Sequence, residues 1–148
     1  MRIQILGGHG GQAKGLSTTS FLINGELLID AGSVAATLSV EEQSRIDHIL
    51  ISHSHLDHIK DLAFLCDNCF GMRPTPFQVY THATVKKILK DHLFNETIWP
   101  DFTILPTEKN PTMEIHSIRP EETFTLKNYK ITPVRVQHPN DAMGFIVE

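Results

Sequence analysis

The chain has 148 residues, of which 41% are hydrophobic and 20% are charged, and its formal net charge is −4. This composition is typical of one globular domain with its own core, and it excludes collagen-like, low-complexity and intrinsically disordered proteins. The negative charge provides no overall attraction to a nucleic-acid polymer or an anionic membrane, and no apolar run reaches the length of a membrane-spanning helix. We therefore expect neither nucleic acid nor a membrane as a partner.

The N-terminal segment and the cysteine content indicate the compartment. Residues 1–6 run directly into glycines, without the hydrophobic stretch or the cleavage site of a secretory signal. Cys66 and Cys69 are the only cysteines in the sequence, so no disulfide framework is expected. We predict a cytoplasmic protein.

Apolar periodicity and turn residues predict the order of the elements. Strands are predicted at residues 2–6, 21–23, 27–29, 46–52, 77–80, 114–118, 123–126, 129–136 and 144–148, and helices or turns at 34–43, 57–70 and 83–94. Asn24-Gly25 predicts a hairpin between the second and third strands, and residues 7–11 form a glycine-rich loop. The last strand continues to the final residue, so we expect a single partial domain over residues 1–148 that is truncated within a strand.

A histidine cluster follows the fourth predicted strand. Residues 53–58 read His-Ser-His-Leu-Asp-His and lead into a predicted helix. Alternate residues of an extended segment point the same way, so His53 and His55 can bind one metal ion, with Asp57 and His58 beside them at the helix start. Imidazole and carboxylate groups suit Zn²⁺, Mn²⁺ or Fe. The alternative is a set of solvated histidines that cap the helix, but chance placement of this pattern is on the order of one in several hundred.

A further histidine is a candidate third ligand. His138 follows the strand predicted at residues 129–136. A lone loop histidine is more often simply exposed, but beside two histidines that leave a metal site incomplete it is the natural completion. Asp141 follows His138 too closely to be assigned as a ligand that bridges two metal ions.

The chain resembles the metallo-β-lactamase superfamily. The resemblance rests on the histidine motif, on the glycine-rich turn at residues 7–11 and on residues 28–32, which read Leu-Ile-Asp-Ala-Gly. The motif at residues 53–59 and the segment DHLFNETIWPDF at residues 91–102 are most similar to class II cyclic-nucleotide phosphodiesterases. The resemblance implies an α+β fold, the metallo-β-lactamase-like αββα sandwich, of which this chain would be the N-terminal αβ half.

The resemblance also implies a chemistry. Two divalent metal ions, zinc or else manganese or iron, would bind, the first to His53, His55 and His138 and the second to Asp57 and His58. A metal-bound hydroxide, oriented by Asp57 as a catalytic residue, would hydrolyse a 3′,5′-cyclic nucleotide (cAMP or cGMP) to a nucleoside 5′-monophosphate. No histidine follows His138, so the second metal site is expected to be incomplete and this fragment alone inactive.

Two departures from the family pattern concern the substrate. Asp61 stands where the family usually has a small residue, and the glycine-rich turn includes His9. Such turns lie near the metal cleft in this fold, so the resemblance makes His9 a candidate substrate contact. Trp99 is a candidate for stacking on a purine base, and burial of its ring in the core is the alternative.

Two other functions are consistent with these residues. The first is an RNase Z-like nuclease or another phosphodiesterase, which the net charge of −4 disfavours because nucleases need basic surfaces. The second is a non-catalytic fragment with a metal-binding or oligomerising role, which the incomplete ligand set would explain. A truncated sheet edge exposes apolar surface, so we expect a homo-oligomer or association through this edge.

Overall fold

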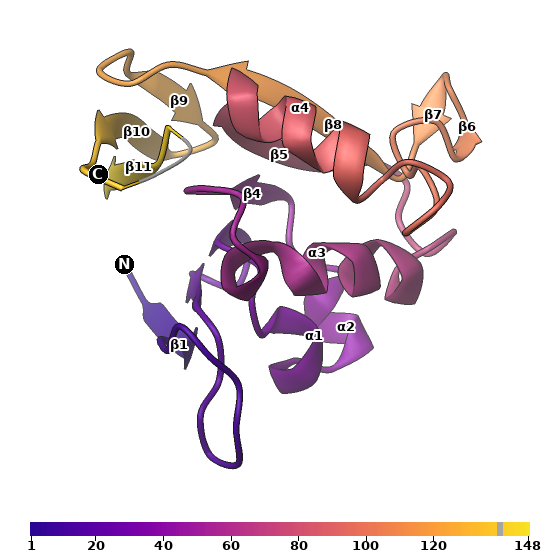
Figure 1. The fold of residues 1–148 in the computed structure, drawn as a ribbon, viewed down its shortest axis with the longest axis horizontal. Helices are drawn as coiled ribbons and strands as arrows, with labels where there is room; N and C mark the ends of the chain where they lie inside the picture. The colour runs from indigo at the N-terminus through magenta and orange to yellow at the C-terminus, as the bar shows by residue number, and fades with distance from the viewer. Residues whose placement is uncertain (139–140) are drawn as a thin grey trace.

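The computed structural model describes residues 1–138 and 141–148 (Figure 1). Its helices are α1 (Val34–Thr37), α2 (Val40–Gln43), α3 (Leu56–Asn68) and α4 (Ala83–His92). Its strands are β1 (Ile3–Gly7), β2 (Ser20–Ile23), β3 (Leu27–Ile29), β4 (His48–Leu50), β5 (Phe77–His82), β6 (Pro106–Thr107), β7 (Asn110–Pro111), β8 (Met113–Ile118), β9 (Phe124–Leu126), β10 (Tyr129–Arg135) and β11 (Met143–Val147). All the predicted strands are therefore present, and the short β6–β7 pair is an addition.

The larger sheet has six strands in the order β1-β2-β3-β4-β5-β8. Its first three strands are antiparallel neighbours, whereas β3, β4, β5 and β8 run parallel. The β2–β3 hairpin turns at Asn24 and Gly25, whose φ angles of 51° and 81° are those that a type I′ turn requires. Because the four parallel strands end at the same edge of the sheet, the loops that follow them lie close together there.

The helices pack on one face of the larger sheet. Ile49, Ile51 and Val79 from the central strands lie in one buried cluster with Leu62 of α3 and Leu89 of α4. Figure 1 shows α3 beside α1 and α2, with α4 beside β5 and β8. In β4 the adjacent residues Ile49 and Leu50 are buried on opposite faces, whereas β5 alternates buried and partly buried residues.

The segment predicted as one helix or turn at residues 34–43 forms two short helices. Ser39 is the N-cap of the second helix, α2, and its hydroxyl accepts a hydrogen bond from the Glu42 backbone N–H at 3.2 Å. The Glu42 carboxylate in turn accepts from the Ser39 backbone N–H at 2.8 Å. This reciprocal pair is a capping box, which satisfies backbone donors at a helix start and so separates α2 from α1.

A smaller antiparallel sheet packs on the opposite face, in the order β11-β10-β9. Leu126 and Ile131 of this sheet are buried against Ile23, Leu27 and Leu50 of the larger sheet. The described chain thus has three layers, which are helices, a six-stranded sheet and a three-stranded sheet. The helical layer and the first sheet of the expected αββα sandwich are present, together with three strands of a second sheet.

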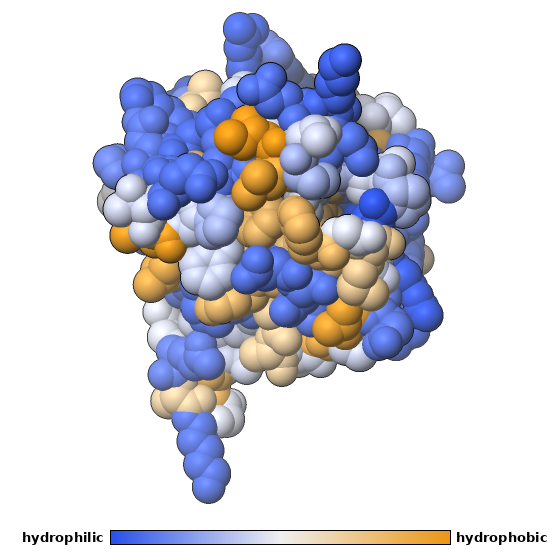
Figure 2. Space-filling model, turned by 90° about the vertical axis from the view of Figure 1, so that its right-hand side faces the viewer, coloured by the Kyte–Doolittle hydropathy of each residue, from blue (hydrophilic) through white to orange (hydrophobic). Residues whose placement is uncertain are grey.

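The loop between β1 and β2 projects from the body of the molecule (Figure 1). Residues 8–16 of this loop are all exposed, and the projection is largely hydrophilic in Figure 2. The helices within residues 1–138 and 141–148 are all too short or too polar to cross a membrane.

Candidate metal centre

The histidine motif lies where the parallel strands of the larger sheet end. Asp30 follows β3, while Ser52 and His53 follow β4, which pairs in parallel with β3. His55 is the residue before α3, and its extended backbone carries the chain from the sheet into that helix. Strand pairing therefore brings Asp30 beside the histidines, although it lies far from them in the sequence.

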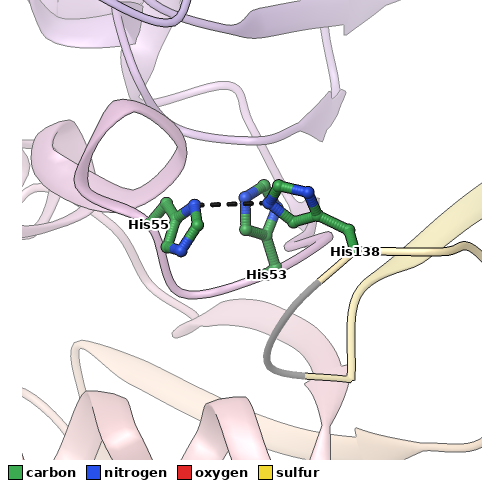
Figure 3. Close-up of side chains that lie close together, drawn as sticks. All are labelled: His53, His55 and His138. Carbon is green, nitrogen blue, oxygen red and sulfur yellow. Dashed lines mark hydrogen bonds between the residues drawn. The ribbon is translucent and has the colours of Figure 1, made fainter.

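The structure brings His53, His55 and His138 together (Figure 3). The ring centroids lie 4.7 Å apart for His53 and His55, 4.6 Å for His53 and His138, and 5.1 Å for His55 and His138. His138 follows β10 of the smaller sheet, whereas the other two follow β4 of the larger sheet. The two sheets therefore both contribute to this cluster.

The three histidines fit a divalent metal ion. Zinc binds imidazole nitrogen at ~2.0–2.1 Å, so two nitrogens on one tetrahedral ion lie roughly 3.3–3.4 Å apart. Nε2 of His138 lies 3.3 Å from Nδ1 of His55, and one ligand atom from each of the three residues falls within 4.8 Å of the others. The rings meet edge to face, at interplanar angles of 70°, 77° and 76°, rather than stacking on one another.

His53 is suited to metal binding because it is neutral and has a defined tautomer. Burial, together with the charge of the neighbouring His58, lowers the pKa of His53 to about 4. The Ser52 hydroxyl donates to Oδ2 of Asp30 at 2.8 Å, so its oxygen is left to accept from Nδ1 of His53 at 3.0 Å. Nδ1 of His53 therefore carries the proton, and Nε2 retains the lone pair that a metal requires.

His58 is oriented by two carboxylates. Its Nδ1 donates to Oδ2 of Asp30 at 2.7 Å, and its Nε2 lies 3.2 Å from Oδ2 of Asp57. Burial by itself lowers the pKa of His58, but the hydrogen bond to Asp30 and the charges of Asp30 and Asp57 outweigh it and raise this pKa. The nitrogen that faces Asp57 is thus the one available for a second metal ion.

All the predicted metal ligands border one cavity of about 240 Å³. Its lining residues are Ser52, His53, His55, Asp57, His58, Val136, His138, Ala142 and Met143. A larger cavity of about 400 Å³ lies against β1 and α2 instead, and it is lined by Arg2 and Arg45 rather than by histidines. The chemistry of the ligands, and not the size of the cavity, therefore identifies the candidate centre.

Sequence reasoning treated Asp30 as part of a family motif and did not assign it or Ser52 to the site. Asp30 is buried and accepts hydrogen bonds from the Ser52 backbone, the Ser52 hydroxyl and His58. It thereby fixes the tautomer of His58 directly and that of His53 through Ser52. The local signal was an acidic residue directly after a predicted strand, and this position alone does not show that the strand lies beside the one preceding the histidines.

Backbone contacts attach the start of α3 to the loop after β3. The Ala31 N–H donates to the His58 carbonyl at 2.7 Å, and the Asp61 N–H donates to the Ala31 carbonyl at 2.8 Å. A Cβ on Gly32 would lie 2.0 Å from the Asp57 carbonyl oxygen, so only glycine permits this approach. This packing determines where Asp57 and His58 lie relative to Asp30.

Asp61, which departs from the family pattern, has a structural role. Its carboxylate is buried and accepts from the Ala35 N–H of α1 at 2.8 Å. The Ser33 side chain, at the N-cap of α1, makes no capping hydrogen bond and instead bonds Thr18 at 2.8 Å. Asp61 therefore caps α1 from the neighbouring helix and, among its described contacts, has none with a predicted ligand.

The two candidate substrate contacts lie outside the histidine cavity. His9 is exposed, and its Nδ1 bonds the Ser17 carbonyl at 3.3 Å, whereas Gly10, Gly11 and Gln12 of the same loop line a separate cavity with Asp57. Trp99 is partly buried against the core, and its ring packs edge to face on Phe64 at 5.4 Å. The substrate roles of His9 and Trp99 thus stay predictions from resemblance.

Comparison with known proteins places this geometry in a family. The sequence profile of the beta-lactamase superfamily domain matches residues 26–148. The chain is 27% identical over 131 residues to the 3′,5′-cyclic-nucleotide phosphodiesterase 1 of Saccharomyces cerevisiae, covering 84% of this chain and 34% of that protein. It is 31% identical over 125 residues to a 3′,5′-cyclic-nucleotide phosphodiesterase of Aliivibrio fischeri, covering 66% of this chain and 36% of that protein. The chain therefore spans about a third of the length of these curated relatives.

Solved structures share the fold. Unliganded yeast PDE1 superposes with a TM-score of 0.74 at 17% identity, over 98% of this chain and 59% of that one. The metallo-beta-lactamase fold protein YhfI of Bacillus subtilis superposes with a TM-score of 0.72 at 21% identity, over 99% and 57%. The short form of human tRNase Z superposes with a TM-score of 0.68 at 19% identity, over 99% of this chain and 64% of that one. The predicted fold is confirmed, and the chain belongs to the metallo-β-lactamase superfamily, with similarity to class II cyclic-nucleotide phosphodiesterases.

Proposed function

We propose that this chain carries the metal-binding part of a phosphodiesterase that hydrolyses a 3′,5′-cyclic nucleotide to a nucleoside 5′-monophosphate. The observation that carries the proposal is the convergence of His53, His55 and His138 in one cavity with Asp57 and His58. The names of the two curated relatives support a cyclic nucleotide, cAMP or cGMP, as the substrate. Family membership supports a metal-dependent hydrolase more broadly.

The residues divide into two groups of donors. His53, His55 and His138 would hold the first divalent ion, and Asp57 with His58 would contribute to a second. Zinc suits this set of nitrogen and carboxylate ligands, as do manganese and iron. When bound, such ions activate water and neutralise charge on phosphoryl oxygens.

The protein residues have separate tasks in this proposal. Asp57 is the catalytic residue, since its carboxylate faces the cavity from the start of α3 and can orient a water molecule beside the phosphate. Asp30 and Ser52 hold the imidazole rings in the tautomers that leave Nε2 free. Among the described residues, Asp57 and His58 have no third ligand atom close enough to complete a second group, so we expect these residues alone to hydrolyse substrate poorly.

Metal stoichiometry and a substrate panel test the proposal. The purified chain is loaded with Zn²⁺ or Mn²⁺, bound metal is measured by mass spectrometry, and hydrolysis of cAMP, cGMP and a structured RNA is followed. We expect at least one tightly bound metal per chain, held measurably but much more weakly in His53→Ala and His138→Ala and unchanged in His92→Ala, which alters an exposed histidine at the end of α4. Absence of metal binding in the unaltered chain would overturn the proposal.

The panel also separates the alternatives. Cleavage of RNA without hydrolysis of cyclic nucleotides would favour the RNase Z-like nuclease function. Human tRNase Z shares the fold of this chain. One bound metal per chain without hydrolysis of any substrate in the panel would favour the non-catalytic role for this chain. Hydrolysis of cAMP or cGMP that depends on His53 would support the phosphodiesterase.

A further inference from the structure

The loop that carries His138 is attached to the larger sheet by its backbone. The Val136 N–H donates to the Ala142 carbonyl at 3.3 Å and closes the base of the loop. Just beyond it, the Met143 N–H donates to the Ser52 carbonyl at 3.0 Å. This contact attaches one side of the loop to the residue that precedes His53.

A side chain attaches the same loop on its other side. Oδ2 of Asp141 accepts from the Thr84 hydroxyl at 2.8 Å, across 57 positions of sequence. The same carboxylate oxygen lies 3.7 Å from Nδ1 of His82. Thr84 lies in the first turn of α4, and His82 is its N-cap, so the carboxylate also meets the positive end of the helix dipole.

We propose that Asp141 is a positioning residue that holds His138 in the metal centre by anchoring its loop to the start of α4. This inference rests on the proposed function, because it gives His138 the role of a metal ligand. Asp141 has no described contact with the three histidines, so it acts through the loop rather than on the metal.

The need for such an anchor follows from where the ligands originate. His53 and His55 occupy a short connection between a buried strand and a helix, and their backbone is confined at both ends. His138 is exposed and lies three positions beyond β10 of the other sheet, so its distance from the other two depends on how the chain beyond β10 is held. Zinc binding requires the three nitrogens within a few tenths of an ångström of their bonding positions, and contacts that hold the described residues on either side of this connection reduce the entropic cost of placing His138.

The backbone conformation of Asp141 suits an aspartate at this position. Its φ angle is 51°, in the left-handed region that aspartate and asparagine tolerate better than most residues. Asp141→Asn therefore keeps the backbone conformation and one acceptor oxygen while it removes the charge. Asp141→Ala removes the acceptor as well.

Zinc affinity, measured by competition with a chromophoric chelator, tests the anchor. We expect Asp141→Ala and Thr84→Val each to weaken Zn²⁺ binding by about tenfold, the lower range for loss of an outer-shell partner. Thr84→Ser, which keeps the hydroxyl, should restore the affinity of the unaltered chain, and Asp141→Asn should lie between. Asp67→Ala, which alters an exposed carboxylate on α3, is the control and should have no effect.

The His138→Ala background distinguishes positioning from general stability. If Asp141 acts through His138, Asp141→Ala causes no further loss of Zn²⁺ affinity once His138 is gone. An equal tenfold loss in both backgrounds would overturn the proposal. Unchanged affinity in both Asp141→Ala and Thr84→Val would do the same.

A metal-free measurement keeps this inference separate from the proposed function. In the apo protein, the His138 N–H donates to the Val136 carbonyl at 3.0 Å, and we expect its hydrogen exchange to be about tenfold faster in Asp141→Ala if the loop is released. Failure of the unaltered chain to bind Zn²⁺ would refute the metal site and with it the role given to His138. Unchanged exchange would refute the anchor itself.

Discussion

Nδ1 of His58 donates a hydrogen bond to Oδ2 of Asp30 at 2.7 Å, although the two residues lie 28 positions apart. The bond crosses from the end of β3 to the first turn of α3, and it leaves Nε2 of His58 directed at Asp57. The same carboxylate oxygen accepts from the Ser52 hydroxyl, whose oxygen meets His53. One buried acidic side chain thus orients a candidate ligand of each metal ion.

Asp30→Asn should therefore weaken the metal centre without unfolding the chain. An amide at this position places a donor against Nδ1 of His58 or the Ser52 hydroxyl, so His58 shifts to the tautomer that has its proton on Nε2. We expect metal affinity or phosphodiesterase activity to fall by about 10–100-fold. Nitrogen-15 NMR of the imidazole rings reports the tautomer, and Ser52→Ala serves as a milder control that leaves the Asp30 charge intact.

Gly32→Ala should destabilise the fold and displace Asp57. The new methyl group would lie 2.0 Å from the Asp57 carbonyl oxygen and 2.7 Å from that of Thr19, and neither backbone atom can rotate away. We expect a loss of about 3 kcal/mol in the free energy of unfolding, at the upper range for overpacking. Urea denaturation measures it, and Gly8→Ala is the matched control because its Cβ meets nothing within 4 Å. Equal stability of the two variants would contradict the packing described.

Asp61→Ala should destabilise the α1–α3 contact. It removes the acceptor for the Ala35 N–H and leaves a partly buried backbone donor unpaired. The expected cost is about 2 kcal/mol in the free energy of unfolding. Asp67→Ala on the exposed face of the same helix should cost much less, and Asp61→Asn should retain most of the stability if the acceptor oxygen is what matters. Thermal denaturation of the three variants shows whether the charge of Asp61 or its hydrogen bond to the Ala35 N–H supplies the stability.

The ion pairs of Lys127 should make the free energy of unfolding depend on pH in the acid range. Hydrogen bonds from Lys127 and Tyr129 lower the pKa of Glu26. Burial raises the pKa of Asp47, but hydrogen bonds from Lys127 and Arg73 outweigh it and lower this pKa. The same two carboxylates raise the pKa of Lys127 to about 12. Depressed carboxyl pKa values contribute stability above the ordinary values of 4.5 and 3.8, and this contribution is lost as the pH falls through the folded-state values.

Lys127→Met should consequently reduce the free energy of unfolding by about 1 kcal/mol at pH 7, and this difference should shrink as the pH falls and the two carboxylates become protonated. The residues are partly exposed, so 1 M salt should also shrink the difference at pH 7. Lys130→Met is the control, since its pair with Glu148 is well exposed and lies within the smaller sheet. Urea denaturation at a series of pH values from 7 downwards measures the effect; a difference that does not shrink as the pH falls would instead indicate lost apolar packing.

The strands and the ligand motif could be predicted from local sequence alone. Alternating or continuous apolar residues specify which segments are strands, and Asn24-Gly25 specifies a turn because few residue pairs adopt its φ angles. The side-chain alternation of an extended segment is equally local, so the closeness of the His53 and His55 side chains could be predicted before the fold was known, whereas their binding of one metal ion stays a prediction. The helix boundary at Ser39 was missed because it depends on a capping box inside an otherwise helical pattern.

Other features depend on which distant segments pair, and no local pattern contains that information. Asp30 joins the site because β3 and β4 are parallel neighbours, Asp141 reaches Thr84 because the connection after β10 lies near the start of α4, and Trp99 packs on Phe64 rather than in the histidine cavity. Local sequence is sufficient to specify most of the elements, the histidine motif and the chemical type of the candidate ligands. The hydrogen bonds that orient the imidazole rings and the meeting of His138 with His53 and His55 depend instead on strand order, register and the packing of two sheets, which arise only in the folded chain.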